Sequence, residues 1–231
     1  MLQIEGINQY YGESHTLWDA SLDVPGGSCV CLMGRNGVGK TTLLKAIMGL
    51  LPVQSGRIIY DNHDIAQESA EARASKGIGY VPQGREIFAQ LTVEENLMTG
   101  LVARRDRLKK IPELVYELFP VLLEMKNRRG GDLSGGQQQQ LAIGRALVLD
   151  PKLLILDEPT EGIQPNIVAE IGETIQKLNS DFGITVLLVE QKLPFARRVG
   201  NQFVIMDRGR VTASGKMEAL GNELVQEYLT V

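Results

Sequence analysis

The stretch Gly34-Arg35-Asn36-Gly37-Val38-Gly39-Lys40-Thr41-Thr42 decides how the rest of the chain is interpreted. It fits the pattern of a glycine, four residues and Gly-Lys-Ser/Thr, which makes a loop that wraps around phosphate groups. The apolar run 29–33 before it is typical of a buried strand. After it, apolar residues recur at helical spacing over residues 40–50: Leu43, Leu44, Ala46, Ile47 and Leu50.

This setting of strand, glycine-rich loop and helix predicts that all nine residues bind a nucleoside triphosphate. Glycines let successive backbone N–H groups point toward one ligand, and the N-terminus of the helix adds a partial positive charge. We expect Lys40 to reach the β- and γ-phosphates and the Thr41 hydroxyl to ligate Mg²⁺. An ordinary glycine-rich turn is the alternative, and the register of strand, loop and helix argues against it.

The composition is that of an ordinary globular protein. The 231 residues suffice for one large domain, and 43% hydrophobic and 23% charged residues are usual for a soluble chain. A net charge of −4 argues against nucleic acid as the main partner. No apolar run approaches the ~20 residues that cross a bilayer, and we expect no secretory signal, so a membrane role must come through a partner. Cys29 and Cys31 are expected in the core, in a reducing compartment.

The order of the segments predicts an α/β fold. Residues 2–30 have the alternation and the turns of an antiparallel β region, in which we place Trp18 in the core. Strands that alternate with helices further along the chain indicate a mostly parallel sheet. From Thr92 to about residue 149 the composition is helical. The short basic run 104–110 fits a solvated helix face or loop better than a site for an anionic partner.

Two adjacent carboxylates follow the apolar strand 153–156. Asp157 is suited to hold Mg²⁺, directly or through water, and Glu158 to orient and deprotonate an attacking water. Gln83 follows another apolar strand, at the end where α/β sheets place ligand-binding groups. A solvated turn after residue 156 is the alternative, and the buried strand before it argues against that interpretation.

Two further segments are candidates for nucleotide contacts. Tyr11 lies shortly before the glycine-rich stretch and is suited either to stack on an adenine ring or to pack in the core, and its position does not decide between them. Ser134 is a good N-cap, and Gly135 and Gly136 open the helix that follows, which is costly unless something approaches the backbone closely. Such a helix start is a second anion site.

These segments carry a resemblance to a known family. The stretch 34–42, Gln83, the segment Leu133-Ser134-Gly135-Gly136-Gln137 and the segment 153–158 occur in the order of the ATP-binding cassette (ABC) ATPases. The resemblance covers essentially the whole chain and implies one nucleotide-binding domain over 1–231. It implies a RecA-like core over 1–87 and 146–231 that includes the antiparallel β region, and an inserted helical subdomain over 88–145 that docks on a membrane partner.

The resemblance also implies roles. Tyr11 would stack on adenine, and Gln83 would touch Mg²⁺ or the attacking water and relay to the membrane subunits. Ser134, Gly135, Gly136 and Gln137 would close over ATP bound by a second ATPase chain. The cofactors implied are ATP and Mg²⁺. The partners implied are that second chain, the permease subunits and, indirectly, a solute-binding protein, with no nucleic acid, at the cytoplasmic face of a bacterial inner membrane.

The chain is most similar to ATPase subunits of bacterial importers of the branched-chain amino acid and amide class. More narrowly, the segments 84–88, 128–132 and 160–165 resemble the urea-importer ATPases. Branched-chain amino acids and short amides are the alternative cargoes. A non-transport ABC ATPase acting on ribosomes or DNA is disfavoured, because such proteins usually fuse two cassettes or carry long coiled-coil insertions.

Two residues depart from the family pattern. Gln191 stands where a histidine is usual, and Gln164 stands where the loop after Glu158 usually ends in aspartate. Gln191 can hydrogen-bond a γ-phosphate or a water but cannot carry charge. The hypothesis that follows is that the chain works beside a different ATPase subunit, with two unequal ATP sites. A regulatory module that binds ATP without hydrolysis is a further alternative, against which Glu158 argues.

Overall fold

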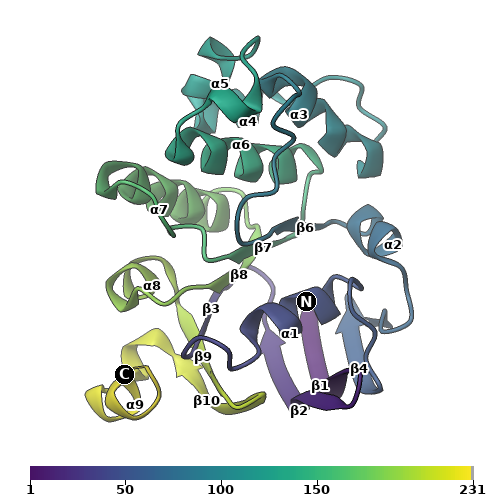
Figure 1. Cartoon of the computed structure of the whole chain (residues 1–231), viewed down its shortest axis with the longest axis vertical. Helices are drawn as coiled ribbons and strands as arrows, with labels where there is room; N and C mark the ends of the chain where they lie inside the picture. The colour runs from purple at the N-terminus through teal and green to yellow at the C-terminus, as the bar shows by residue number, and fades with distance from the viewer. Residues whose placement is uncertain (230–231) are drawn as a thin grey trace.

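The computed structural model describes residues 1–229. Helices α3 to α6 (residues 93–148) gather at the top of Figure 1. Below them a six-stranded sheet runs from the middle to the lower left, and a four-stranded antiparallel sheet lies at the lower right. The described residues thus have the α/β architecture that the sequence predicts, with a mainly parallel core sheet and an N-terminal antiparallel region.

The six-stranded sheet has the order β10-β9-β3-β8-β7-β6, and all its neighbours are parallel except the pair β9–β10. Every residue of β3, β7 and β8 is buried, because other layers cover both faces of the sheet. The strand bounds are β3 Cys29–Met33, β6 Ile78–Val81, β7 Leu153–Asp157, β8 Thr185–Val189, β9 Gln202–Asp207 and β10 Arg210–Lys216.

Alternate residues of β3 belong to two different hydrophobic cores. Cys29, Cys31 and Met33 face the core that contains residues of the helices in the second half of the chain. Val30 and Leu32 face the core formed with the first helix and the antiparallel sheet. Both cysteines are buried free thiols, which confirms their predicted place in the core.

The antiparallel sheet has the order β2-β1-β4-β5, and its strands are β1 Leu2–Tyr11, β2 Ser14–Val24, β4 Ser55–Tyr60 and β5 His63–Asp64. The prediction that Trp18 lies in the core is wrong, since 40% of this residue is exposed. Its neighbour Leu17 is the fully buried residue of this part of β2, and successive side chains of a strand point to opposite faces. The Trp18 ring instead packs against His15, with 3.5 Å between ring centroids, and under the Arg210 guanidinium.

The first helix, α1 (Lys40–Ile47), ends earlier than the predicted residue 50. Gly49 takes a left-handed conformation, with φ of +72°, and stops the helix. Arg73, the last-turn residue of α2 (Ala70–Ser75), is buried and donates hydrogen bonds of 2.7 Å to the carbonyls of Ala46 and Ile47. These bonds satisfy carbonyl groups that the end of α1 leaves without helical partners.

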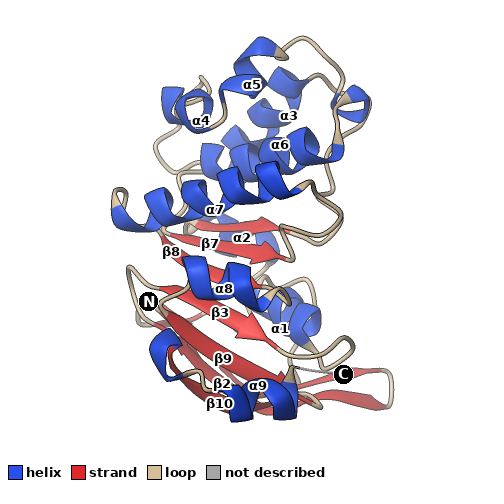
Figure 2. Ribbon diagram, turned by 90° about the vertical axis from the view of Figure 1, so that its left-hand side faces the viewer, coloured by secondary structure: helices blue, strands red, loops and turns tan. Residues whose placement is uncertain are grey.

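The remaining α-helices form the group at the top of Figure 1 and the layer on one face of the sheet. Figure 2 shows α7 and α8 beside that sheet. Residues 113–124, within the region of predicted helical composition, form two helices, separated at Phe119 by the proline that begins the second. The bounds are α3 Val93–Thr99, α4 Glu113–Leu118, α5 Pro120–Glu124, α6 Gly135–Val148, α7 Pro165–Ser180, α8 Leu193–Val199 and α9 Asn222–Tyr228, with 3₁₀ turns at 100–103, 130–132 and 217–219. Over residues 1–229 no helix has the length and apolar character to cross a membrane.

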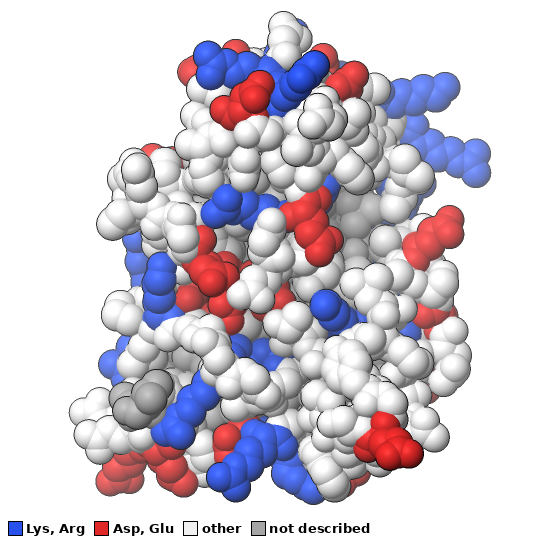
Figure 3. Space-filling view, in the orientation of Figure 1, with Lys and Arg blue, Asp and Glu red and all other residues white. Residues whose placement is uncertain are grey.

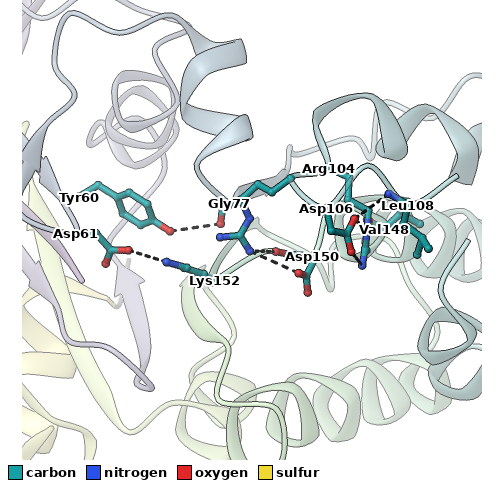
Figure 4. Close-up of polar contacts among 10 residues, drawn as sticks. Tyr60, Asp61, Gly77, Arg104, Asp106, Leu108, Val148, Asp150 and Lys152 are labelled. Atoms are coloured by element: carbon teal, nitrogen blue, oxygen red, sulfur yellow. Dashed lines mark hydrogen bonds and ion pairs between the residues drawn. The ribbon is translucent and has the colours of Figure 1, made fainter.

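The basic run 104–110 is a loop, and its first two arginines hold the end of α6 (Figure 4). Arg104 donates to the Val148 carbonyl at 2.7 Å, and Arg105 donates to the Asp150 carbonyl at 2.9 Å. Asp106 accepts two hydrogen bonds from the Arg104 guanidinium, and this contact raises the pKa of Arg104 above its usual value. Positive groups are favourable at a helix C-terminus, so part of this run stabilises the fold.

Candidate functional site

The phosphate loop (residues 34–42) connects β3 to α1, and its backbone needs glycine at two positions. Gly34 has φ of +149°, and a side chain there would run into the Met206 carbonyl. Gly39 has φ of +106° at the N-cap of α1, where a side chain would lie 3.1 Å from Leu17. The two glycines therefore let the loop curl around the N-terminus of the helix, which is the backbone arrangement that phosphate binding requires.

Lys40 begins α1 and is buried under the loop. Its ammonium donates hydrogen bonds of 2.8 Å to the Gly34 and Arg35 carbonyls. Burial lowers the pKa of this ammonium, and the nearby charges of Glu158 and Asp157 partly restore it. The structure thus places a cation against the inner side of the phosphate loop.

Asp157 is the last residue of β7 and is only 1% exposed. Neither of its carboxylate oxygens has a hydrogen-bond partner of good geometry in the described structure. Burial raises the pKa of Asp157 to about 6, although the Thr41 hydroxyl and the Lys40 ammonium act in the opposite direction. A buried carboxylate without partners is costly unless it binds something, and a cation is the simplest ligand.

Glu158 follows directly, with its backbone in the left-handed region at φ of +50°. Such a conformation costs a non-glycine residue roughly 1–3 kcal/mol, and such residues cluster at active sites. The Glu158 carboxylate accepts hydrogen bonds from the Gln191 amide at 2.5 Å and from the Gln83 amide at 3.4 Å. Gln191 also donates to the Asn36 side-chain oxygen at 2.7 Å. Residues from four separate segments, all predicted for the site, are therefore joined by one network.

A cleft of about 640 Å³ opens over this network. Figure 2 shows β3, β7 and β8 ending on the same side, and Figure 3, which views the molecule from that side, shows acidic side chains gathered near the middle. The predicted residues that line the cleft are Asn36, Gly37, Gly39, Lys40, Thr41, Thr42, Gln83, Glu158 and Gln191. Six lining residues were not predicted: Thr16, Thr160, Glu161, Gly162, Glu190 and Lys192.

Other predicted residues lie outside the cleft lining. Tyr11, at the end of β1, is 47% exposed, so the core alternative for this residue is wrong. Gly34, Arg35, Val38 and Asp157 belong to the same local structure as the cleft but do not line it. The other residues of the phosphate loop, and Glu158 directly after β7, do line the cleft.

The Ser134–Gln137 segment begins α6 and does not line the cleft. Ser134 and Gln137 form a capping box, in which the Gln137 side chain accepts from the Ser134 N–H at 2.9 Å. A side chain at Gly136 would lie 2.9 Å from Ile167 in α7. Within this chain, the glycine therefore lets α7 pack closely against the start of α6.

A family model described as "ABC transporter" matches residues 17–161, which is more than half of the chain. The protein belongs to the ABC transporter family. Two relatives are ATP-binding proteins for branched-chain amino acid transport. One, named BraG, from Pseudomonas aeruginosa, is 42% identical over 91% of each chain. The other, a probable LivF from Archaeoglobus fulgidus, is 37% identical over 98% of this cassette and 94% of its own length.

Solved cassettes have the same fold. A nucleotide-free ATP-binding cassette from an ABC transporter superimposes with a TM-score of 0.84 at 28% identity, over 99% of this chain and 94% of that one. A dimeric cassette in a post-hydrolysis state, bound to ADP and phosphate, superimposes with a TM-score of 0.82 at 25% identity, over 94% and 99%. The ABC ATPase fold and the ATPase activity that the sequence predicts are confirmed at the level of the family.

The residues at the cleft fit a magnesium nucleotide. No group of three His, Cys, Asp or Glu side chains gathers as a metal site within residues 1–229. Mg²⁺ bound with nucleotides needs only one or two carboxylates and completes its ligands with waters and phosphate oxygens. Asp157 offers unpartnered carboxylate oxygens beside the Thr41 hydroxyl, and these are the hard oxygen donors that Mg²⁺ prefers.

Proposed function

We propose that this ABC ATPase hydrolyses ATP in the cleft over the phosphate loop and drives solute import through permease subunits. The observation that carries the proposal is the pair Asp157–Glu158 at the end of β7, of which Glu158 lines the same cleft as Lys40. In this arrangement residues 34–42 bind the phosphates, with Lys40 exchanging its two backbone carbonyls for phosphate oxygens. Thr41, Asp157 and Gln83 hold Mg²⁺, which supplies charge neutralisation on the phosphates.

Glu158 is proposed as the base that accepts a proton from the attacking water. Its two amide contacts, Gln83 and Gln191, come from the ends of two other strands and would fix the carboxylate and the water. Tyr11 is proposed to stack on the adenine ring, because it lies exposed at the end of β1 while the neighbouring β2 contributes Thr16 to the cleft.

The Ser134–Gln137 segment is proposed to complete the site of a second ATPase chain. Within one chain this helix start lies outside the cleft, which supports a contact with ATP across a dimer. Because Gln191 and Gln164 depart from the family pattern, we propose that the second chain is a different subunit with an unequal site. The helical subdomain, residues 88–145, would dock on the permease and hold the chain at the cytoplasmic face of the inner membrane.

We propose urea as the cargo, supported by the resemblance of segments 84–88, 128–132 and 160–165 to urea-importer ATPases. Branched-chain amino acids are the second candidate, favoured by the names of the two relatives. The permease and a solute-binding protein, not this subunit, would contact the cargo. The choice between the two therefore needs an uptake measurement.

The decisive experiment deletes the gene and measures uptake of labelled urea and labelled leucine, with wild type or Lys40→Ala restored. Loss of urea uptake, rescued by wild type alone, is the expected result. Loss of leucine uptake instead would correct the cargo, and unchanged uptake of both would overturn the transport function. In the purified transporter, Glu158→Gln should abolish turnover and preserve ATP-dependent dimerisation. Equal effects of disabling the glutamate of either ATPase chain would overturn the unequal-site proposal.

A further inference from the structure

Three side-chain contacts join the loop after β7 to the loop after β8. The middle one is the bond from Gln191 to Glu158 described above. On one side of it the Thr160 hydroxyl donates to the Glu190 carboxylate at 2.7 Å. On the other side the Lys192 ammonium donates to the Thr160 carbonyl at 2.9 Å. Thr160 is thus held at both its hydroxyl and its carbonyl by the residues that flank Gln191.

Glu190 and Thr160 are both buried, with 3% and 0% exposure. One carboxylate oxygen of Glu190 accepts the backbone N–H groups of Gln191 and Lys192, at 2.8 and 2.9 Å, and the other accepts the Thr160 hydroxyl. A buried carboxylate is tolerated when its oxygens accept several hydrogen bonds, and such charge-assisted bonds are stronger than neutral ones. Glu190 therefore fixes the backbone on which Gln191 stands relative to the loop that carries Glu158.

We propose that Thr160 and Glu190 are positioning residues, which hold the Gln191 amide against the Glu158 carboxylate during hydrolysis. Neither acts on the nucleotide itself, and both act through Gln191. The inference rests on the proposed roles of Glu158 and Gln191 in hydrolysis. A neutral amide makes shorter-range interactions than a charged imidazolium, so its contribution depends more on being held in place.

The test uses two variants at one position in the full transporter. Thr160→Val keeps the shape and removes the hydroxyl, and we expect ATP turnover to fall about tenfold with little change in KM, because the lost contact acts on the chemical step. Thr160→Ser restores the hydroxyl and should restore most of the turnover. The matched control is Thr185→Val, which removes an equally buried hydroxyl at the far end of β8. This control should leave turnover unchanged.

A double-mutant comparison separates positioning from a general structural role. If Thr160 acts through Gln191, Thr160→Val should cause no further loss of turnover in a Gln191→Ala background. Equal fold-losses in the wild-type and Gln191→Ala backgrounds would overturn the inference. Gln191→Ala without any effect on turnover would instead overturn the proposed role of Gln191, so the two failures are distinguishable.

One measurement besides activity, made on two variants, completes the test. Hydrogen exchange of the Gln191 and Lys192 amides should be faster in Thr160→Val than in wild type, because Glu190 would lose the hydroxyl that steadies it. Lys192→Met, a change at an exposed residue that does not threaten the fold, should speed the same amides and lower turnover more weakly than Thr160→Val. Unchanged exchange in both variants would overturn the inference.

Discussion

Replacing Asp157 by asparagine should stabilise the nucleotide-free protein at neutral and alkaline pH, although it removes a residue that we place in the metal site. The pKa of Asp157 is raised by burial from its usual 3.8 to about 6. Neither carboxylate oxygen has a hydrogen-bond partner of good geometry that would offset the cost of burying the charge. At 1.36 kcal/mol for each pKa unit, the charged form costs the folded state ~3 kcal/mol.

The direction of this stability effect and its pH range follow from the pKa of Asp157 in the unfolded and in the folded state. Because the folded-state pKa is the higher one, the protonated carboxyl is the form that favours folding. The penalty is nearly absent below pH 4, grows as pH rises through 6 and is complete above about pH 7. The neutral amide of an asparagine at this position would carry no such penalty. The stability advantage of Asp157→Asn should therefore increase by roughly 1–2 kcal/mol between pH 5 and pH 8.

The assay is guanidinium chloride unfolding at both pH values, with EDTA and without nucleotide. Glu158→Gln is the matched control, because that carboxylate already accepts two hydrogen bonds and should show no comparable gain. Adding Mg²⁺ and ATP should reverse the order, since wild type gains stability from the bound metal and the variant does not. An Asp157→Asn variant no more stable than wild type at pH 8 would refute the reasoning.

Three further predictions concern other parts of the molecule. Tyr11→Ala should weaken nucleotide binding about tenfold in a calorimetric titration, as loss of base stacking does, while Tyr10→Ala, at a neighbour whose ring stacks on His15, should not. Arg104→Met should lower the free energy of unfolding by roughly 1–2 kcal/mol, because the Val148 carbonyl loses its donor, and an unchanged value would contradict the capping role. Cys29 and Cys31 should react with a thiol reagent only at the rate of unfolding, because both are buried and the pKa of Cys31 is raised well above its usual value by its neighbour Cys29 and by burial.

The parts of the site that the sequence predicts are those built from local patterns. The phosphate loop depends on glycine spacing between one strand and one helix, and both neighbours show their periodicity in the sequence. Asp157 ends one apolar strand and Gln83 follows another, and parallel strands that lie side by side bring such ends together. The fold class follows from the same alternation of strands and helices.

The parts that the sequence does not predict depend on contacts between distant segments. A glutamate at position 190 carries no local sign of burial. Only the contact between the loops after β7 and β8 makes it a buried acceptor of three hydrogen bonds. The end of α1 depends on Arg73, which lies 26 residues beyond Ile47 in the chain. Glu161 could have been noticed from its position after the Asp-Glu pair, but its contact with the Gln83 amide at 2.9 Å has no local signal.

The exposed position of Trp18 gives the protein a spectroscopic reporter of its own. It is the only tryptophan in the sequence. Its backbone N–H donates to the Gly209 carbonyl, and the Gly209 N–H donates in turn to the Val38 carbonyl of the phosphate loop. Two successive hydrogen bonds thus connect that loop to the backbone of Trp18, whose half-exposed indole packs against His15. Intrinsic fluorescence should therefore follow nucleotide occupancy in real time, without a dye and without an engineered residue.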